Sequence, residues 1–350
     1  MPHLRPHAVA VVAAVAVTIA LADPRGAAAQ SVLLRPPNLS GGWLGLPGTL
    51  QFNFLHRFGV SDPPLRKVTN SPTFVLSYPL TGFLTLGTSY ATSSDVTPAF
   101  PNEWELFARV AGPAGPLDVA AQAGYNQAAE SMDGEITLGA EAGRIRLLAV
   151  GRVLSNGYND DELRFAAGGG AVLRVTDGLA LAGDVTALFE RETGEEIAWG
   201  AGLQLAIPYS PHTLSLQVTN TNTATLQGLS RGIDQVRGGF EFTIPFTLSR
   251  YFGNRRTTAQ DGAAGAAEGP VTPAEIRGMA FTPRLEIPAG TTIAWTNHDP
   301  VVHTITADDG SWDSGPIEPG ATWRRTFERA GDYSYHCTPH PYMRGAVVVR

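Results

Sequence analysis

The residues best suited to chemistry lie near the C-terminus, in the stretch Cys337-Thr-Pro-His340-Pro-Tyr-Met343. This stretch places a thiol, an imidazole and a thioether at intervals of three residues, and His303 lies thirty-four residues before the cysteine. Two imidazoles and one thiolate in a plane, with a weak axial thioether, form the ligand set of a blue-copper electron-transfer site. The spacing therefore predicts that His303, Cys337, His340 and Met343 bind one copper ion.

Other interpretations of these residues explain less. Zinc would recruit more thiolates or keep a water ligand. Cys337 is the single cysteine, which excludes a four-thiolate site and an intramolecular disulfide. Taken one at a time, His303 would be interpreted as a strand-end histidine, Cys337 as a buried thiol and Met343 as a core methionine. His298 precedes the ligand strand in a turn, and His336 should face away from its neighbour Cys337 in an extended segment, so we predict that neither is a ligand.

The same region resembles the cupredoxins, in particular the amicyanin-like and plastocyanin-like type 1 copper proteins. The resemblance covers the last 77 residues. It rests on the stretches Phe281-Thr-Pro, Pro288-Ala-Gly, Trp295-Thr-Asn-His-Asp, Val302-His-Thr and Tyr335-His-Cys-Thr-Pro-His-Pro-Tyr-Met-Arg-Gly. It implies a β-sandwich with one type 1 copper on the four ligands, and periplasmic redox proteins as partners in single-electron transfer. Thr304 departs from the pattern, because many relatives place there an Asn that ties the two ligand loops together.

These ligands must be positioned by short strands separated by turns. The turns are marked by Pro288-Ala-Gly, Pro319-Gly and Ala330-Gly. About 77 residues of this kind predict a C-terminal Greek-key β-sandwich at residues 274–350. The expected strands are 276–281, 285–287, 292–295, 302–306, 322–327, 333–336 and 345–349. An Ala- and Gly-rich stretch at 254–273 reads as a flexible linker before this domain.

The larger part of the chain, residues 30–253, alternates apolar and polar residues with a period of two. In one segment Leu147 and Ala149 alternate with Arg146 and Arg152. Such alternation is typical of strands with one apolar face. Twelve are expected, beginning near Thr49, Thr73, Phe83, Glu103, Leu117, Gly134, Arg144, Arg164, Leu179, Glu196, His212 and Val236. The fold class is therefore all-β, with an N-terminal antiparallel barrel of about twelve strands before the cupredoxin-like sandwich.

The connections between these strands alternate in length, with loops such as Gly59 to Pro72 and Thr219 to Gln235 opposite short turns. Short turns at one rim and long loops at the other are typical of outer-membrane barrels, and an even strand number puts both chain ends at the short-turn, periplasmic rim. A soluble barrel or sandwich would alternate equally but turn its apolar face inward. We favour the membrane barrel, although the alternation alone leaves the direction of the apolar face open.

Three further features of the barrel region carry little chemistry. Gly228-Leu-Ser-Arg-Gly232 fits the nucleophile elbow of esterases, but it lies in a polar loop with no helix after it, so no esterase is expected. His56 and His212 are expected at strand ends, as surface or lumen residues. The stretch His56-Arg-Phe58 loosely resembles a bacterial barrel-like domain family of unknown function, which supplies no mechanism.

The N-terminus has the order of a secretory signal peptide: Arg5 and His7, an apolar run from Ala8 to Ala22, then Ala27-Ala-Ala29. Residues 1–29 are therefore expected to be cleaved, in an exported protein. The chain is 43% hydrophobic and 16% charged with net charge −7, which excludes disorder and a nucleic-acid partner.

Three functions follow from this sequence. The first is a periplasmic type 1 copper electron-transfer module tethered to an outer-membrane barrel and its lipid. The second is a copper-capture or buffering protein whose barrel is a conduit. The third is a barrel that is a passive pore or scaffold, with the copper domain as an accessory. If the apolar face of the barrel points inward, the chain would instead be a soluble, secreted cupredoxin of two domains. An enzyme is not expected, because a single type 1 site lacks a catalytic metal.

Overall fold

The computed structural model describes residues 32–45, 49–61, 63–97, 101–176, 178–207, 210–248 and 270–350. The predicted signal peptide 1–29 and the linker up to residue 269 lie outside the described residues. The chain divides into two compact units, which we describe separately. Within the described ranges, no helix has the length and apolar character needed to cross a membrane.

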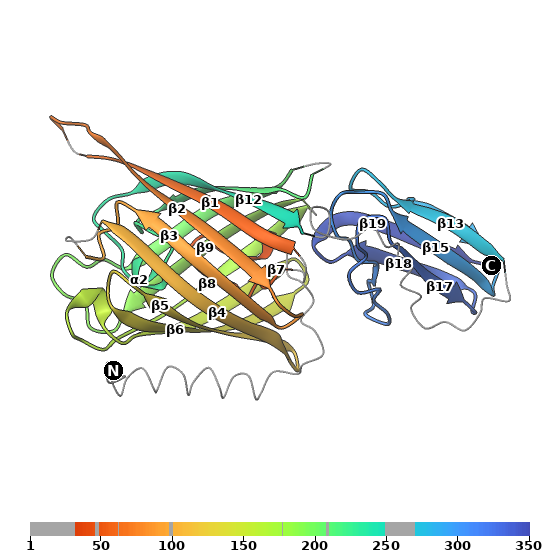
Figure 1. The fold of residues 1–350 in the computed structure, drawn as a ribbon, viewed down its shortest axis with the longest axis horizontal. Coiled ribbons are helices and arrows are strands. Elements are labelled where there is room, and N and C mark those ends of the chain that lie inside the picture. Colours follow the sequence, from red (N-terminus) through yellow and green to blue (C-terminus); the bar gives the residue numbers. More distant parts are fainter. Residues whose placement is uncertain are drawn as a thin grey trace. The chain divides into compact units, whose positions relative to one another are not determined.

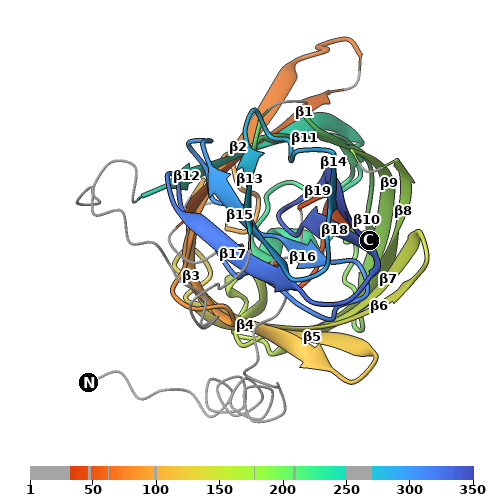
Figure 2. The same ribbon diagram turned by 90° about the vertical axis from the view of Figure 1, so that its right-hand side faces the viewer.

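Twelve strands close into a barrel in which each strand pairs with its neighbours in the chain and β1 meets β12, as the sequence predicts (Figure 1 and Figure 2). The strand pairs are antiparallel, and their pairing covers most of each strand. The strands are β1 (Thr49–Val60), β2 (Val68–Pro79), β3 (Leu84–Thr92), β4 (Asn102–Ala114), β5 (Leu117–Asn126), β6 (Ser131–Ala142), β7 (Ile145–Leu154), β8 (Arg164–Thr176), β9 (Leu179–Leu188), β10 (Ala198–Ala206), β11 (Thr213–Thr219) and β12 (Arg237–Thr247).

The first hairpin is longer than predicted. The segment Gly59 to Pro72 is not all loop, because β2 begins at Val68 and pairs there with Val60. The same extension moves His56 from a strand end to the interior of β1. Its ring lies 4.1 Å from that of Phe58, between centroids, on the outward face of the barrel. The expectation that His56 ends a strand was wrong, since pairing with β2 continues beyond it.

The barrel wall turns its polar face inward and its apolar face outward. In β7, Arg146 and Arg152 are buried, whereas Leu147 is 56% exposed. In β4, Glu103 and Glu105 are buried, and Leu106 is 60% exposed. Exposed apolar side chains continue around the wall at Leu138, Leu173, Leu181, Val185, Leu216 and Val218. The interior is therefore a polar core, and the outer surface is the apolar one.

Two segments outside the wall strands lie within this interior. One is residues 32–45, which begin with a short 3₁₀ helix, η1 (Val32–Leu34). The other is the β11–β12 loop, which carries the one-turn helix α2 (Leu226–Ser230), drawn inside the barrel in Figure 1. All five residues of α2 are buried. The nucleophile-elbow pattern overlaps this helix, where the Ser230 hydroxyl donates to the Leu226 carbonyl at 2.7 Å. Among the described residues, no helix follows the pattern before β12, as the sequence predicts.

The C-terminal unit is a sandwich of two sheets, in the orders β13-β15-β17 and β14-β19-β18-β16. Its strands are β13 (Val271–Ile276), β14 (Arg284–Ile287), β15 (Thr291–Asn297), β16 (Thr306–Ala307), β17 (Thr322–Phe327), β18 (Gly331–Cys337) and β19 (His340–Val349). An apolar core fills the space between the sheets, with Trp295 and Tyr335 fully buried. The Trp295 indole donates to the Tyr335 hydroxyl at 3.2 Å, so these two buried polar atoms satisfy each other.

Two predicted boundaries in this unit differ from the structure. The first strand starts at Val271, before residue 274, because residues 271–276 pair in parallel with β15. The predicted strand 276–281 is instead a turn, closed by a bridge between Ile276 and Phe281. Gly278 and Met279 have positive φ there, which an extended strand does not allow.

Candidate metal centre

Three of the four predicted ligands meet at one end of the sandwich. The Cys337 Sγ atom lies 3.6 Å from Nδ1 of His303 and 3.4 Å from Nδ1 of His340. All three side chains are buried, and their ligand atoms lie within 4.8 Å of one another. A first-row metal sits roughly 2.0–2.3 Å from each nitrogen or sulfur donor, so one ion can bridge atoms at these separations. The donor set therefore fits a bound metal.

The protonation states of the site suit a metal ligand set. Burial raises the pKa of the Cys337 thiol to about 12. Burial also lowers the pKa of His340 well below its usual value, and nearby His303 lowers it further. Near neutral pH His340 is thus a neutral imidazole, and the Cys337 thiol keeps its proton. Metal binding must displace that thiol proton.

The loop after β15 orients His303. Asn297, the last residue of β15, donates from its side chain to the carbonyls of Val301 and Ile317, both at 2.8 Å. Asp299 accepts from Nε2 of His303 at 3.0 Å, which leaves Nδ1 to face the sulfur. A carboxylate on the distal nitrogen fixes the tautomer of a metal-binding histidine and makes it a stronger donor.

The surroundings of Asp299 favour the ionised form of its carboxyl group. Its burial alone would raise its pKa, but the hydrogen bond from His303 and those from the backbone amides of Met279 and Gly278 lower it to about 2. These amides lie 2.8 and 2.5 Å from the carboxylate. The group therefore stays ionised at physiological pH and holds the imidazole from behind.

A group of threonines joins the two ligand loops. The Thr304 amide donates to Cys337 Sγ at 3.3 Å, and its hydroxyl accepts from the Thr338 amide at 2.8 Å. The Thr306 hydroxyl is 2.8 Å from that of Thr338 and donates to Asp313 at 2.8 Å. Thr304 thus makes the loop-to-loop bond for which the sequence comparison expected an asparagine, with Thr306 and Asp313 behind it.

Two other histidines of this unit make their printed contacts outside the cluster of His303, Cys337 and His340. His336 bonds Asp308 through Nδ1 at 2.6 Å on the outer side of β18. His298 is partly exposed, with its ring 3.9 Å from Glu275. Met343, the predicted axial ligand, is 1% exposed and belongs to the same core cluster as Cys337. Its role as a ligand remains a prediction.

Sequence reasoning did not find Asp299 or Asp313. An acidic residue four positions before a ligand histidine is a usable signal for the first, because a tight loop brings such a residue behind the ring. The second lies ten residues beyond His303 in a turn and has no comparable signal. It reaches Thr306 only because a bridge between Thr306 and Asp313 folds that turn back.

Comparisons with known proteins agree with this geometry. Residues 270–350 match the model of the family described as copper binding proteins, plastocyanin/azurin family. Amicyanin from Paracoccus denitrificans is 38% identical over 93 residues, which are 25% of this chain and 70% of the relative. Amicyanin from Paracoccus versutus is 32% identical over 106 residues, covering 26% of this chain and 80% of the relative. A solved structure, a purple cupredoxin from Nitrosopumilus maritimus, is 32% identical, with coverage of 22% of this chain and 98% of that one and a TM-score of 0.21.

Proposed function

Because the chain belongs, through residues 270–350, to the plastocyanin/azurin family of copper-binding proteins, we propose that its C-terminal domain is a type 1 copper electron carrier. The observation that carries the proposal is the buried triad of His303, Cys337 and His340, with both Nδ1 atoms turned toward one sulfur. Copper bound there by two imidazoles and a thiolate would cycle between Cu(II) and Cu(I), one electron at a time.

The chain's own residues would keep that site rigid and dry. Cys337 and His303 are fully buried, so water is kept from the metal. Asp299 holds the His303 ring, and the Thr304–Thr338 hydrogen bond fixes the cysteine loop. Ligands that hardly move between oxidation states favour fast electron transfer. A buried ligand set also favours a resident metal over released cargo, which argues against the copper-capture alternative.

We further propose that the barrel anchors the protein in an outer membrane. Its apolar side chains face outward and its charged ones inward, the arrangement of membrane barrels. Phe54, Phe74 and Phe240 form an outward aromatic group within β1, β2 and β12. Five other outward aromatic residues lie where strands meet the long loops, as in the interfacial girdle of such barrels. These are Tyr90, Trp104, Tyr125, Phe165 and Phe189.

The topology gives this anchor a direction. With twelve strands, the chain enters and leaves the barrel at the rim of the short turns, which faces the periplasm in bacterial barrels. The copper domain would then work on the periplasmic side. Its partners would be redox proteins of that compartment, with outer-membrane lipid around the barrel.

The copper proposal is tested on the full chain loaded with copper. We expect one copper per chain, an intense visible band from thiolate-to-Cu(II) charge transfer and the narrow EPR hyperfine splitting of a type 1 centre. Reversible one-electron cycling without loss of metal to a chelator should accompany it. A colourless Cu(II) adduct, or copper that transfers rapidly to the chelator, would contradict electron carriage and favour capture.

The membrane proposal has its own test. Protease added to intact cells should cut the long loops while residues 274–350 stay protected, and the protein should remain in membranes through high-salt and carbonate washes. A chain that washes off as a soluble monomer would contradict the anchor and leave a secreted protein of two domains.

A further inference from the structure

The interior of the barrel is occupied by chain rather than left as a channel. Residues 32–45 precede β1 and so enter from the rim of the short turns, and the β11–β12 loop, residues 220–236, enters from the opposite rim. The two segments meet at Asn38, whose side chain donates to Thr219 at 3.1 Å and accepts from the Thr221 hydroxyl at 3.0 Å. A plug requires such contact inside the lumen between segments that enter from both rims.

The wall is chemically complementary to the β11–β12 loop. Its carboxylates accept hydrogen bonds from donors of the loop: Leu226 N reaches Glu105 at 2.7 Å, and the Gln227 amide reaches both oxygens of Asp133 at 3.0 Å. The hydroxyls of Thr223 and Thr225 donate to Glu103. Buried carboxylates need such partners, so the loop completes the wall's hydrogen bonding.

Wall arginines hold both segments at once. Arg152 pairs with Glu135 at 2.8 Å, donates to the Leu229 carbonyl of α2 at 2.7 Å and to the Asn38 carbonyl at 2.8 Å. Arg57 donates to Thr221 and to the Thr223 carbonyl, both at 2.7 Å. Charge-assisted bonds of this kind are stronger than neutral ones. The two segments are thus fastened to the wall by Arg57 and Arg152.

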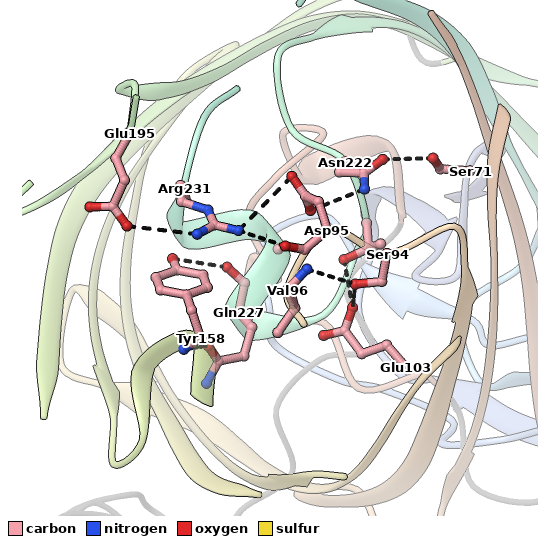
Figure 3. Close-up of polar contacts among 12 residues, drawn as sticks. Ser71, Ser94, Asp95, Val96, Glu103, Tyr158, Glu195, Asn222, Gln227 and Arg231 are labelled. Atoms are coloured by element: carbon pink, nitrogen blue, oxygen red, sulfur yellow. Dashed lines mark hydrogen bonds and ion pairs between the residues drawn. The ribbon is translucent and has the colours of Figure 1, made fainter. Parts of the chain in front are cut away.

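At the rim of the long loops, Arg231 connects the β11–β12 loop to three other loops (Figure 3). Arg231 follows α2 and lies with its guanidinium carbon 3.9 Å from the centre of the Tyr158 ring. It donates to the Asp95 carbonyl at 3.0 Å and lies 3.8 Å from the Glu195 carboxylate. Tyr158, Asp95 and Glu195 come from three different loops, so one side chain ties all of them to the plug loop.

We infer that residues 32–45 and the β11–β12 loop form a two-part plug that closes the lumen, so that the barrel serves as an anchor and does not conduct copper or other solutes. A cavity between the two segments, beside Arg35, Glu105 and Leu229, measures about 80 Å³. That is room for a few water molecules rather than a continuous path. The conductance test of this inference rests on the proposed placement of the barrel in a membrane. The inference that the two segments fill the lumen does not rest on that placement.

Conductance of the full chain in planar bilayers of phosphatidylethanolamine and phosphatidylglycerol tests the plug. The native protein should give no current steps. A variant with residues 224–231 replaced by a short Gly-Ser linker should give discrete steps. A matched control with the exposed loop residues 63–66 replaced in the same way should stay silent. Native protein that conducts as the plug variant does would overturn the inference.

A second measurement needs neither a membrane nor the loop replacement. In a Cys337→Ser background, Ser89→Cys places a thiol on the lumen face, where Ser89 is 3% exposed and borders the remaining cavity. Glu162→Cys places one on an exposed loop as the control. A bulky maleimide should label the loop cysteine rapidly and the lumen cysteine only on unfolding. Equal labelling rates in the folded protein would overturn the plug, whatever the bilayer result, whereas a protected lumen thiol in a chain that enters no bilayer would contradict only the membrane placement.

Discussion

The barrel and the copper domain are built from the same alternation of apolar and polar residues, and they bury opposite faces. In the copper domain the core is aromatic, with Trp295 and Tyr335 fully buried between two sheets. In the barrel the core consists of arginines, carboxylates and amides, and leucines cover the outside. Two flat sheets can close directly on apolar side chains, whereas twelve strands enclose a lumen that needs additional chain to fill it.

This difference shows that a buried core need not be apolar if its charged groups find hydrogen-bond and ion-pair partners. The lumen of the barrel satisfies its charges with ion pairs and with donors from the two plug segments. The copper domain instead buries mainly apolar and aromatic side chains between its two sheets. Substitutions of the two kinds should therefore have distinct consequences.

The largest effect is expected at the metal. Cys337→Ser removes the thiolate and should abolish the visible band of the copper-loaded protein completely, while the barrel keeps its folded migration on unheated gels. His340→Ala should also destroy the site. His336→Ala is the matched control, because its ring bonds Asp308 on the other face, and its spectrum should remain largely intact. An unchanged spectrum in Cys337→Ser would remove the copper assignment.

The polar core is tested next by Arg152→Ala. Both side chains of the Arg152–Glu135 pair are buried, so the variant leaves an unpaired charge and should lower the unfolding free energy of the barrel by about 3–5 kcal/mol. Arg174→Ala breaks the ion pair between Arg174 and Glu141, whose side chains are both partly exposed. This variant should change the unfolding free energy of the barrel by about 1 kcal/mol or less. Urea titrations in lipid vesicles measure both. Equal effects would mean that water already fills the lumen.

The outer face is tested by Val185→Arg, near the middle of β9, where the side chain is 50% exposed. In a membrane the charge should destabilise the barrel by about 2–4 kcal/mol near the bilayer midplane. On a soluble barrel the same exposed substitution should lie within about 0.5 kcal/mol of the native protein. A change in unfolding free energy within about 0.5 kcal/mol, measured in the same titrations, would count against the membrane anchor.

Met343→Gln should leave copper bound and change its reduction potential. An oxygen donor stabilises Cu(II), whereas a thioether favours Cu(I), so the reduction potential should fall. Protein-film voltammetry gives the value, and copper content per chain gives the control. A variant that holds no copper would show that Met343 supports the structure of the loop rather than tuning the metal.

The smallest effect is expected from Thr304→Val, which keeps the shape of the side chain and deletes the hydroxyl that accepts from the Thr338 amide. Loss of one buried hydrogen bond of this kind should destabilise the copper domain by about 1–3 kcal/mol without removing copper. The visible band should broaden or shift, because the cysteine loop is held less tightly. Thr304→Ser retains the hydroxyl and should restore the native spectrum.

Much of the site was predictable because its ligands are close in sequence. Cys337 and His340 lie on one loop, and the spacing of residue types alone indicates copper. The supporting contacts were harder to predict. Asp299 and Asp313 reach their partners through loop closures that have no periodic signal, and Thr304 makes the bond expected of an asparagine because Thr338 approaches it across the two loops.

By itself the sequence determined the twelve barrel strands and brought out His303, Cys337 and His340, which meet in the candidate site, since period-two alternation and ligand spacing are local properties. It did not determine which face of the barrel is inside, because reversing the direction of the apolar face leaves the alternation unchanged. Tertiary structure decided that question. Only the closed ring creates a lumen, and only there do the loop at 220–236 and the segment at 32–45 meet the buried charges of the wall, which leaves the leucines to face outward.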